Sequence, residues 1–503
     1  MNKNKGRISS QTIGWLAWSG ASTVFLQVVG IGSIAVLARL LTQEDYGVFA
    51  AALIFIGLVR SGLVQGGFPT AMIQRQDLTP LHIRNAFTGT VILHVVAGVL
   101  IWVGSDALAL FFKMPELSDV LKAMCIIVAI NPFYSVSSAL LRRRKRFRVI
   151  ALSDMISSIF ANTAVAIVLA LYGFGVWSLV ISNISWAVVQ TVVMYAIARF
   201  NPLPAITSHM RDLLSLSMGF TFGALLAMLA EQAPKFAIGR LLGADVLGVY
   251  NRSNRLMSFP ITLLGATSVL FPVMSDMNDD MARMARGYLR AVSLCTLVVA
   301  PLTVLLCHAA EGFILLLLGD RWIAAIEPTA ILSLTLVFAL SLKMANIVFM
   351  AMGKIRAIAI RQASFAAFIV VGSVAGSRWG LEGVCVAILL AYIGCYVISL
   401  HLANRLLDVG WLDFAKANVP GLSLALPVLV ALVLGETFIW HDAPKYLLFP
   451  IEAAVTGFVI YAACVIKPSW FLGADGVWLL SELRQRAPRR LRALIPGVRA
   501  ELP

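Results

Sequence analysis

Long runs of apolar residues recur along the whole chain, and they constrain its fold more than any other feature of the sequence. Several runs reach the roughly 20 residues that a helix needs to cross a hydrocarbon core about 30 Å thick. Hydrophobic residues make up 60% of the 503 positions and charged residues only 13%, whereas an ordinary soluble domain is nearer half apolar and a quarter charged. A soluble fold cannot bury so much apolar surface, so we expect an integral membrane protein.

The lipid environment also predicts the secondary structure of these runs. The bilayer core holds no water, so every backbone N–H and C=O group must find a partner within the protein. The runs are too long and too evenly apolar for the alternating strands of a membrane β-barrel. We therefore predict an all-α integral membrane protein.

Counting the apolar runs between polar breaks predicts fourteen transmembrane helices. The predicted spans cover residues 13–38, 47–72, 85–105, 118–141, 149–171, 175–198, 213–239, 247–275, 287–307, 327–351, 357–376, 380–402, 418–437 and 446–466. No small-residue cleavage signal follows the basic start, so we expect the first span to be retained. The stretch at 308–330 holds a shorter apolar piece that suits a re-entrant or interfacial segment.

The distribution of Lys and Arg tests this count independently, because one false span would invert the sign of every later loop. With a cytoplasmic N-terminus, 28 of the 40 Lys and Arg residues fall on the cytoplasmic side and 6 on the other side. The remaining 6 lie within spans or at their ends. We therefore expect both termini in the cytoplasm. The position of these Lys and Arg residues in short loops and tails beside the spans also explains the net charge of +15. We therefore expect membrane lipids as partners and do not expect nucleic acid.

Three short sequences occur twice in the chain, in the same order. ARLLTQEDYGVF at 38–49 matches GRLLGADVLGVY at 239–250, RFRVIA at 146–151 matches KIRAIA at 354–359, and YGFGVWSLV at 172–180 matches WGLEGVCVA at 379–387. The matches predict that helices 1 to 6 and helices 7 to 12 are copies, with two helices appended. Each copy holds an even number of spans, so the copies are parallel repeats related by an axis along the membrane normal.

This repeat divides the chain into four predicted parts. They are an N-lobe at 1–211, a C-lobe at 212–405, helices 13 and 14 at 406–467, and a basic cytoplasmic tail at 468–503. Two such lobes enclose a central cavity, where substrates of transporters usually bind. The tail alternates apolar residues such as Trp478 with arginines, which is typical of a helix on an anionic inner leaflet. The alternative is that the basic residues of the tail serve only to fix the topology of the chain.

Ionisable residues inside the spans are the candidates for function, because a charge in hydrocarbon costs about 2.5 to 3.5 kcal/mol on insertion scales. Arg60 lies near the middle of predicted helix 2, and Glu231 and Lys235 lie four residues apart on predicted helix 7. Arg252 and Arg255 lie near the start of predicted helix 8. These are the inner helices of a two-lobe arrangement, so the cations are expected to line one cavity. Such a cavity suits an anionic diphosphate, because Arg presents paired donors that match phosphate oxygens.

Each of these residues also has a structural alternative. Glu231 and Lys235 would simply neutralise each other, and Arg252 and Arg255 would reach the outer interface. The structural alternative is weakest for Arg60. This residue lies roughly 20 Å along the helix from its outer end, so its side chain would reach water there only with difficulty.

The sequence predicts no cofactor. It contains no GxxxxGK[ST] motif, so ATP bound to this chain would not power transport. The six cysteines fall in apolar segments without metal-ligand spacing, and we expect them to be buried small hydrophobes, with no metal site. If transport is active, the energy must come from a gradient of H+ or Na+ or from consumption of the product outside, and Glu231 is the candidate residue for ion coupling.

The order of several motifs resembles a known family. The motifs are ARLL…YGVF at 38–49, GFPTAMIQR at 67–75, LGADVLGVYNRSNRL at 242–256, FPVMSDMNDD at 271–280 and LGDRW at 318–322. They are similar to the polysaccharide transporter family of the multidrug/oligosaccharidyl-lipid/polysaccharide exporter superfamily, and in particular to its Wzx-type branch of colanic-acid and exopolysaccharide flippases. The resemblance covers about residues 10–465.

This resemblance implies a MATE-like fold with two six-helix lobes and alternating access between them. The implied substrate is an undecaprenyl-diphosphate-linked repeat unit, moved across the bacterial inner membrane for exopolysaccharide or lipopolysaccharide biosynthesis. Arg60, Lys235, Arg252 and Arg255 fall where cations that engage the diphosphate or acidic sugars would be expected. A polysaccharide polymerase or co-polymerase is the protein partner that fits this role.

Two other functions remain open at this point. A MATE-like drug or cation antiporter would need acids around its cavity, and the first span carries none before Arg39. A membrane-embedded glycan polymerase or transferase would need a sizeable loop with clustered acids or His. The acidic cluster Asp276, Asp279 and Asp280 lies in a short loop without a partner His. We therefore predict a transporter and not an enzyme.

Overall fold

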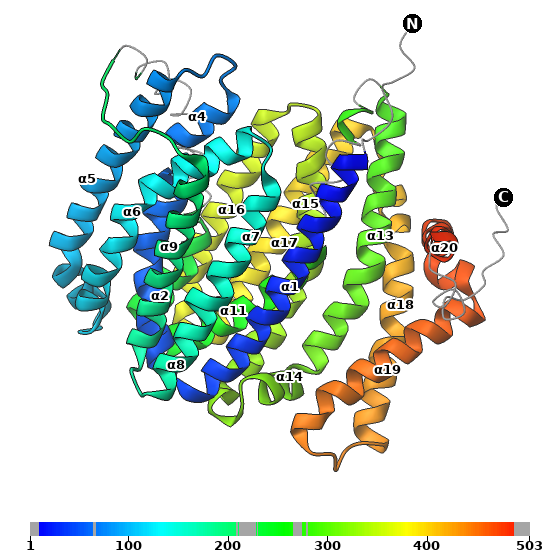
Figure 1. Cartoon of the computed structure of the whole chain (residues 1–503). Helices are drawn as coiled ribbons and strands as arrows, with labels where there is room; N and C mark the ends of the chain where they lie inside the picture. The colour runs from blue at the N-terminus through cyan, green and yellow to red at the C-terminus, as the bar shows by residue number, and fades with distance from the viewer. Residues whose placement is uncertain are drawn as a thin grey trace, which may run out of the picture. The chain divides into compact units, whose positions relative to one another are not determined.

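A computed structural model describes residues 10–63, 67–207, 210, 228, 230–264, 274–277 and 280–486 (Figure 1). Every regular element in these ranges is helical, which confirms the all-α prediction. The predicted boundary between lobes at residue 211 lies outside the described residues. So do Asp279, most of predicted helix 7, the end of predicted helix 8, the basic N-terminus before residue 10 and the end of the basic tail after residue 486.

The chain forms two compact units, Met1–Asn251 and Arg252–Pro503. The helices of the first unit are α1 (Ser10–Leu40), α2 (Gln43–Gly57), η1 (Leu58–Leu63), α4 (Phe68–Gln74), α5 (Pro80–Phe112), α6 (Leu117–Arg143), α7 (Phe147–Ile156), η2 (Ser157–Ala164), α8 (Val165–Leu171) and α9 (Val176–Ala198). Residues 230–241 are also helical, and α11 (Ala244–Leu264) begins in this unit. Within the unit, α6 packs against α5 on one side and α9 on the other.

The starts of two of these helices follow from their cap residues. Thr42 precedes α2, and its hydroxyl accepts a hydrogen bond from the backbone N–H of Asp45 (3.1 Å) while the Asp45 carboxylate accepts one from the Thr42 N–H (2.8 Å). Thr79 and His82 form the corresponding pair at the start of α5. Such reciprocal caps satisfy N–H groups that have no partner within the helix.

Two stretches of the first unit are π-helical. η1 continues α2 and carries Arg60, and η2 separates α7 from α8 within the predicted span 149–171. π-helical turns interrupt the regular α-helical hydrogen bonding and are frequent at functional sites. The position of Arg60 is therefore one where the backbone departs from a regular α-helix.

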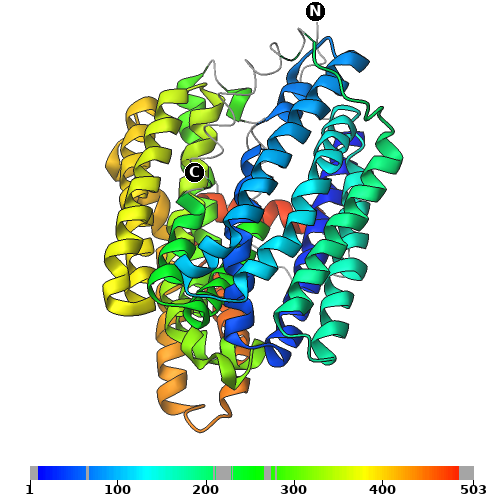
Figure 2. The ribbon, with the colours of Figure 1, turned by 90° about the vertical axis from the view of Figure 1, so that its left-hand side faces the viewer.

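The second unit contains the remaining helices. They are α13 (Met281–His308), α14 (Ala310–Leu317), η3 (Asp320–Ala325), α15 (Ile326–Ala351), α16 (Ile355–Gly376), η4 (Ser377–Trp379), α17 (Gly380–Leu407), α18 (Trp411–Phe438), α19 (Lys445–Ile466) and α20 (Pro468–Arg486). Within this unit, α13 packs along α15 and α18, and α16 packs along α17. The long helices of each unit run roughly alongside one another in Figure 2. The stretch 308–330, predicted to hold a re-entrant or interfacial segment, contains α14. This helix has eight residues and is too short to cross a membrane.

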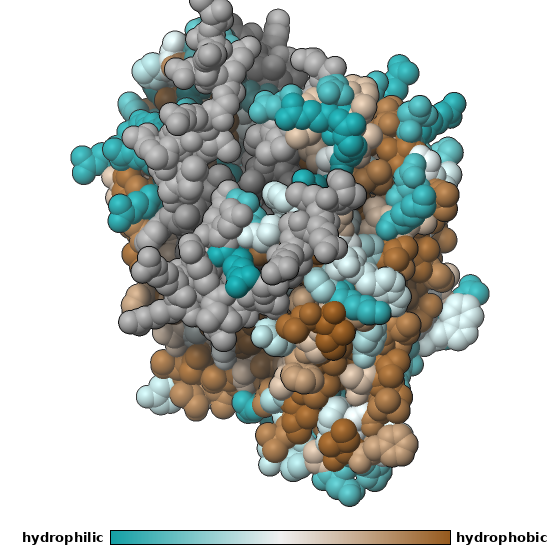
Figure 3. All heavy atoms as spheres, turned by 90° about the vertical axis from the view of Figure 1, so that its right-hand side faces the viewer, coloured by the Kyte–Doolittle hydropathy of each residue, from teal (hydrophilic) through white to brown (hydrophobic). Residues whose placement is uncertain are grey.

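Nine helical segments of the described residues are long and apolar enough to span a membrane. They are Pro80–Phe112, Leu117–Arg143, Phe147–Leu171, Val176–Ala198, Met281–His308, Asp320–Ala351, Arg356–Leu407, Trp411–Phe438 and Lys445–Ile466. Arg356–Leu407 includes two helices, α16 and α17. Large apolar side chains are exposed, as at Leu110 (81%) and Phe438 (80%), and Figure 3 shows hydrophobic residues over much of one face. The chain is therefore a multi-pass membrane protein.

The final helix, α20, packs against other helices of the second unit. It bends at Gly473, whose φ of +63° favours glycine. Arg290 on α13 forms an ion pair with Asp475 (3.2 Å), and its guanidinium carbon lies 3.8 Å from the ring centroid of Trp478. The described start of the predicted basic tail is thus held to α13 by named contacts.

Candidate functional site

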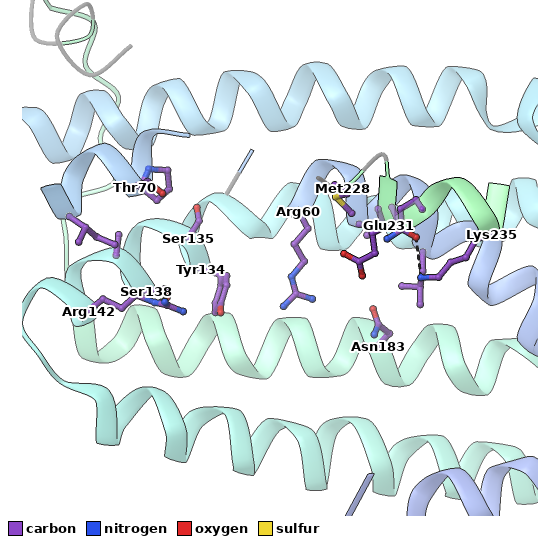
Figure 4. A pocket seen from close by; sticks show the side chains of 17 residues that line it. Arg60, Thr70, Tyr134, Ser135, Ser138, Arg142, Asn183, Met228, Glu231 and Lys235 are labelled. Carbon is purple, nitrogen blue, oxygen red and sulfur yellow. Dashed lines mark hydrogen bonds between the residues drawn. The ribbon is translucent and has the colours of Figure 1, made fainter. Parts of the chain in front are cut away.

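The first unit contains a pocket of about 670 Å³. Its walls come from α2, η1, α4, α6, α9 and the helical residues that follow position 227. The polar residues that line it are Arg60, Thr70, Tyr134, Ser135, Ser138, Arg142, Asn183, Glu231, Gln232 and Lys235. Figure 4 shows Arg142 toward one end, Arg60 in the middle, and Glu231 and Lys235 toward the other end.

Arg60 is held beside two aromatic rings. Its guanidinium carbon lies 4.2 Å from the ring centroid of Trp186 and 5.9 Å from that of Tyr134. Cation–π contacts of this kind stabilise a guanidinium by about 0.5 to 2 kcal/mol and fix its position. A guanidinium carries five N–H donors, so one held in this way can still donate to an anion.

Arg142 lines the same pocket, which the sequence analysis did not anticipate. There it counted only as one of a run of cytoplasmic charges that set the topology. Its Nε donates to the hydroxyl of Ser138 (3.4 Å), one α-helical turn earlier on α6. Sequence alone could not separate it from its basic neighbours, because all of them satisfy the positive-inside rule equally well.

The next residue, Arg143, supports the pocket without lining it. Its Nη1 donates to the carbonyl oxygens of Met72 (3.0 Å) and Arg75, and its Nη2 donates to that of Gln76 (2.7 Å). These carbonyls lie at the C-terminal end of α4, where a helix leaves its last C=O groups without partners. Because α4 supplies Thr70 and other wall residues, Arg143 positions one side of the pocket.

Glu231 and Lys235 both line the pocket from the helical residues 230–241. The Lys235 ammonium donates to the side-chain oxygen of Gln232 (3.1 Å). Among the described residues that line the pocket, the charged ones are Arg60, Arg142, Lys235 and Glu231, so three cations face one acid. The lining is therefore net positive.

An acid outside the lining, Asp154, modifies this balance and was missed in the sequence analysis. It lies on α7 within electrostatic reach of Arg60 and Arg142, and it accepts a hydrogen bond from Gln190 on α9. The signal was present, because an acid inside an apolar span is rare and usually functional.

Arg252 and Arg255 are separate from this pocket. Both belong to the second unit, on α11, and neither is among the described residues that line the pocket. The guanidinium carbon of Arg255 lies 5.5 Å from the ring centroid of Phe259. Of the five candidate residues, the structure thus brings Arg60, Glu231 and Lys235 into one pocket.

The second unit holds another group of ionisable side chains. The Nε2 atom of His308 on α13 lies 3.2 Å from a carboxylate oxygen of Glu436 on α18 and 3.7 Å from one of Glu452 on α19. Glu452 is only 4% exposed, and its Oε2 has no hydrogen-bond partner in the described part of the chain. His308 thus lies within 4 Å of both carboxyl groups.

The pocket residues suit the binding of an anion. Arg60 and Arg142 supply planar donors that match phosphate or carboxylate oxygens, and Lys235 adds a compact positive charge. Across the described ranges, no group of three or more His, Cys, Asp or Glu side chains is arranged to hold a metal ion. The three cations of the lining offer electrostatic binding of an anion.

Comparison with known proteins places these features in context. ExoT of Rhizobium meliloti (strain 1021), a succinoglycan biosynthesis transport protein, is 28% identical over 333 residues, which cover 65% of this chain and 66% of ExoT. TuaB of Bacillus subtilis (strain 168), a teichuronic acid biosynthesis protein, is 23% identical over 338 residues, or 65% of this chain and 68% of TuaB. The chain thus matches about two thirds of the length of these relatives.

A solved structure shares the fold over a greater length. The lipid II flippase MurJ, in an inward closed conformation, superposes with a TM-score of 0.74 at 14% identity, covering 89% of this chain and 97% of MurJ. At this identity the likeness concerns the fold alone.

The resemblance indicated by the sequence motifs is confirmed by a family model. The model describes a polysaccharide biosynthesis protein and matches residues 36–327, which is more than half of the chain. The matched range includes the motifs ARLL…YGVF, GFPTAMIQR and LGADVLGVYNRSNRL. The chain therefore belongs to this family of polysaccharide biosynthesis proteins.

Proposed function

We propose that this protein is a flippase that moves undecaprenyl-diphosphate-linked oligosaccharides across the bacterial inner membrane for exopolysaccharide or lipopolysaccharide biosynthesis. The family, and relatives whose names refer to polysaccharide transport and biosynthesis, support this role. The observation that carries the proposal is the net positive pocket, two of whose walls, α6 and α9, are apolar enough to span a membrane.

Moving a diphosphate through a bilayer costs free energy. A charged group loses its hydration in hydrocarbon, so a transporter must replace water with fixed charges and donors. Arg60, Arg142 and Lys235 are spaced along the pocket in Figure 4 and would offer such replacements. Electrostatic interactions are stronger there than in bulk water, because the surrounding dielectric constant is lower.

The finer architecture is part of the proposal. We infer fourteen transmembrane helices, two six-helix lobes with two appended helices, and both termini in the cytoplasm. The nine described candidate spans and the excess of Lys and Arg in predicted cytoplasmic segments support this topology. Alternating access between the lobes would expose the pocket to each side in turn. Arg252 and Arg255 stay candidates for contact with the substrate from the second unit.

Coupling to H+ or Na+ through Glu231 is the corresponding proposal for energy input. Glu231 is the only acid among the described residues that line the pocket, where it lies with Arg60 and Lys235. A proton or sodium ion bound at this carboxylate would change the net charge that a diphosphate meets. The same lining argues against a cationic drug as substrate, because three cations would repel it.

The test is transport in proteoliposomes. Purified protein would be reconstituted with an undecaprenyl-diphosphate-linked oligosaccharide, and the sugar that becomes accessible to an external glycosidase would be followed over time. Arg60→Ala removes a charged donor worth about 1.5 to 3 kcal/mol, so we expect transport to slow by about tenfold or more.

The matched control is Arg378→Ala. Arg378 is exposed on η4 and does not line the pocket, so this variant loses the same charge without changing the site. Wild-type rates are expected for it. Transport by Arg60→Ala at the wild-type rate would remove the proposed binding site, and no transport by the wild-type protein would contradict the proposed function.

A further inference from the structure

A groove of about 580 Å³ lies wholly within the second unit, between the start of α16 and the end of α17. Three cations line it, namely Lys354 and Arg356 beside α16 and Arg405 on α17. Its walls also include Ile360, Leu402 and Leu406. The groove thus combines positive charge with apolar surface, and it is separate from the pocket around Arg60.

The three cations have no partners of their own. In the described ranges, none of their side chains makes a hydrogen bond, an ion pair or a ring contact. Some other basic residues at helix ends do have partners. Arg84 and Arg144, for example, donate to backbone carbonyls (both 3.0 Å). The charges in the groove are therefore available to a ligand.

The charge balance of the groove favours an anion. No acid is present among the described residues that line it, so its lining carries three positive charges and no negative one. Like charges repel even when water screens them, and a bound anion replaces that repulsion with attraction. Arg356 and Arg405 also offer the forked donors that match phosphate oxygens.

The apolar walls narrow the class of anion. Ile360 is half exposed, and Leu402 and Leu406 are partly buried beside it. A free phosphate would contact only the cations and leave these walls in water. A phospholipid would use both parts of the groove, with its phosphate at the cations and an acyl chain along the walls.

The position of the groove relative to the bilayer agrees with such a ligand. The segment Arg356–Leu407 is long and apolar enough to span a membrane, and the groove lies where both of its helices meet their polar ends. Basic pockets between helices at a membrane surface attract anionic headgroups. We propose that this groove binds an anionic phospholipid of the bilayer, at the end of α16 and α17 that the distribution of charge predicts to be cytoplasmic.

The test measures lipid binding and is independent of transport. Full-length protein in detergent, freed of co-purified lipid, would be titrated with phosphatidylglycerol or with phosphatidylcholine, and bound lipid would be measured by native mass spectrometry and by the rise in the unfolding temperature. We expect phosphatidylglycerol to bind and stabilise the protein, and phosphatidylcholine to do so much less.

The test variant is the triple substitution Lys354→Gln, Arg356→Gln and Arg405→Gln. A cation near an anionic membrane surface is worth about 1 kcal/mol, so we expect binding of phosphatidylglycerol to weaken on the order of a hundredfold. These side chains are exposed and unpartnered, so folding should be unaffected. The single variant Arg405→Gln, with an expected loss of about fivefold, provides a second measurement if the triple variant is poorly produced.

The matched control removes three other exposed cations, through Arg146→Gln, Arg283→Gln and Arg286→Gln. These residues do not line the groove, and the control has the same net charge as the test variant. It should keep the wild-type preference for phosphatidylglycerol. An equal loss in the control would show a general surface-charge effect and overturn the proposal. Unchanged binding by the test variant would do the same, as would equal stabilisation by inorganic phosphate alone.

Discussion

Two glycines at equivalent positions of the repeated sequence lie at close backbone contacts within the first unit, and replacing one of them should destabilise the protein. Gly47 on α2 lies against Ala244, and Gly248, 201 residues later, lies against Gln43. A methyl group on Gly47 would overlap the Ala244 carbonyl and lie 2.9 Å from its Cα. A methyl group on Gly248 would meet the Gln43 carbonyl in the same way.

The expected magnitude follows from two opposing effects. An ordinary contact of a methyl carbon is 3.4 Å or more, so the Ala244 Cα would have to move by about 0.5 Å and its nearer carbonyl by more, and overpacking of this kind costs about 1 to 3 kcal/mol and occasionally more. Alanine is favoured over glycine in a helix by about 1 kcal/mol. The overlap is with backbone atoms, so the upper end of this cost applies, and Gly47→Ala should lower the free energy of unfolding by about 2 kcal/mol or more.

The control has the opposite expected sign. Gly457 lies inside α19, and a methyl group there would have no atom within 4 Å. Gly457→Ala should keep the helix-propensity gain alone and stabilise the protein by up to about 1 kcal/mol. Thermal unfolding in detergent would compare Gly47→Ala, Gly248→Ala and Gly457→Ala with the wild-type protein.

The result is a difference between variants. In a chain of this size, 1 kcal/mol shifts the unfolding temperature by about 2 °C or less, so Gly47→Ala and Gly457→Ala should move it in opposite directions by amounts that replicate scans can resolve. If Gly47→Ala unfolds at the same temperature as Gly457→Ala, the two backbones can separate without cost, and the reasoning from close contact is wrong.

Two further predictions concern contacts of ionisable side chains between helices. Arg143→Gln removes the guanidinium that caps α4, so it should lower the unfolding temperature and, by displacing one pocket wall, slow transport. The thermal scan and the proteoliposome assay measure these two effects. Wild-type values in both assays would contradict the capping role. His308→Leu removes the imidazole beside the buried Glu452 and should destabilise the protein by about 1 to 3 kcal/mol, the cost of leaving a buried polar group without its neighbour. Adding Glu452→Leu should recover most of that loss in thermal scans at pH 7, and a double variant no more stable than His308→Leu would refute the pairing.

Part of the candidate site could be predicted from the sequence. A charge inside an apolar run is visible without any structure, and its high cost in hydrocarbon predicts that it will face a polar cavity. Arg60, Glu231 and Lys235 were chosen on that ground, and all three line one pocket. Asp154 obeyed the same rule and could have been found in the same way.

The rest of the site depended on contacts between distant segments. Arg142 and Arg143 are adjacent and chemically identical, yet one lines the pocket and the other caps a helix about 70 residues away in sequence. Trp186 lies 4.2 Å from the Arg60 guanidinium but occurs on another helix, in a span rich in apolar residues where one aromatic residue does not stand out.

The sequence by itself determined that this chain is a bundle of membrane helices with repeated motifs and buried charges. Hydrophobicity and backbone hydrogen bonding are local properties, and in lipid they leave few alternatives to helices. Only the tertiary structure decided which charges share a pocket, which are used to cap a helix and which stay without partners in the groove of α16 and α17. Those outcomes depend on side-chain geometry across helices, and no pattern along a single helix specifies it.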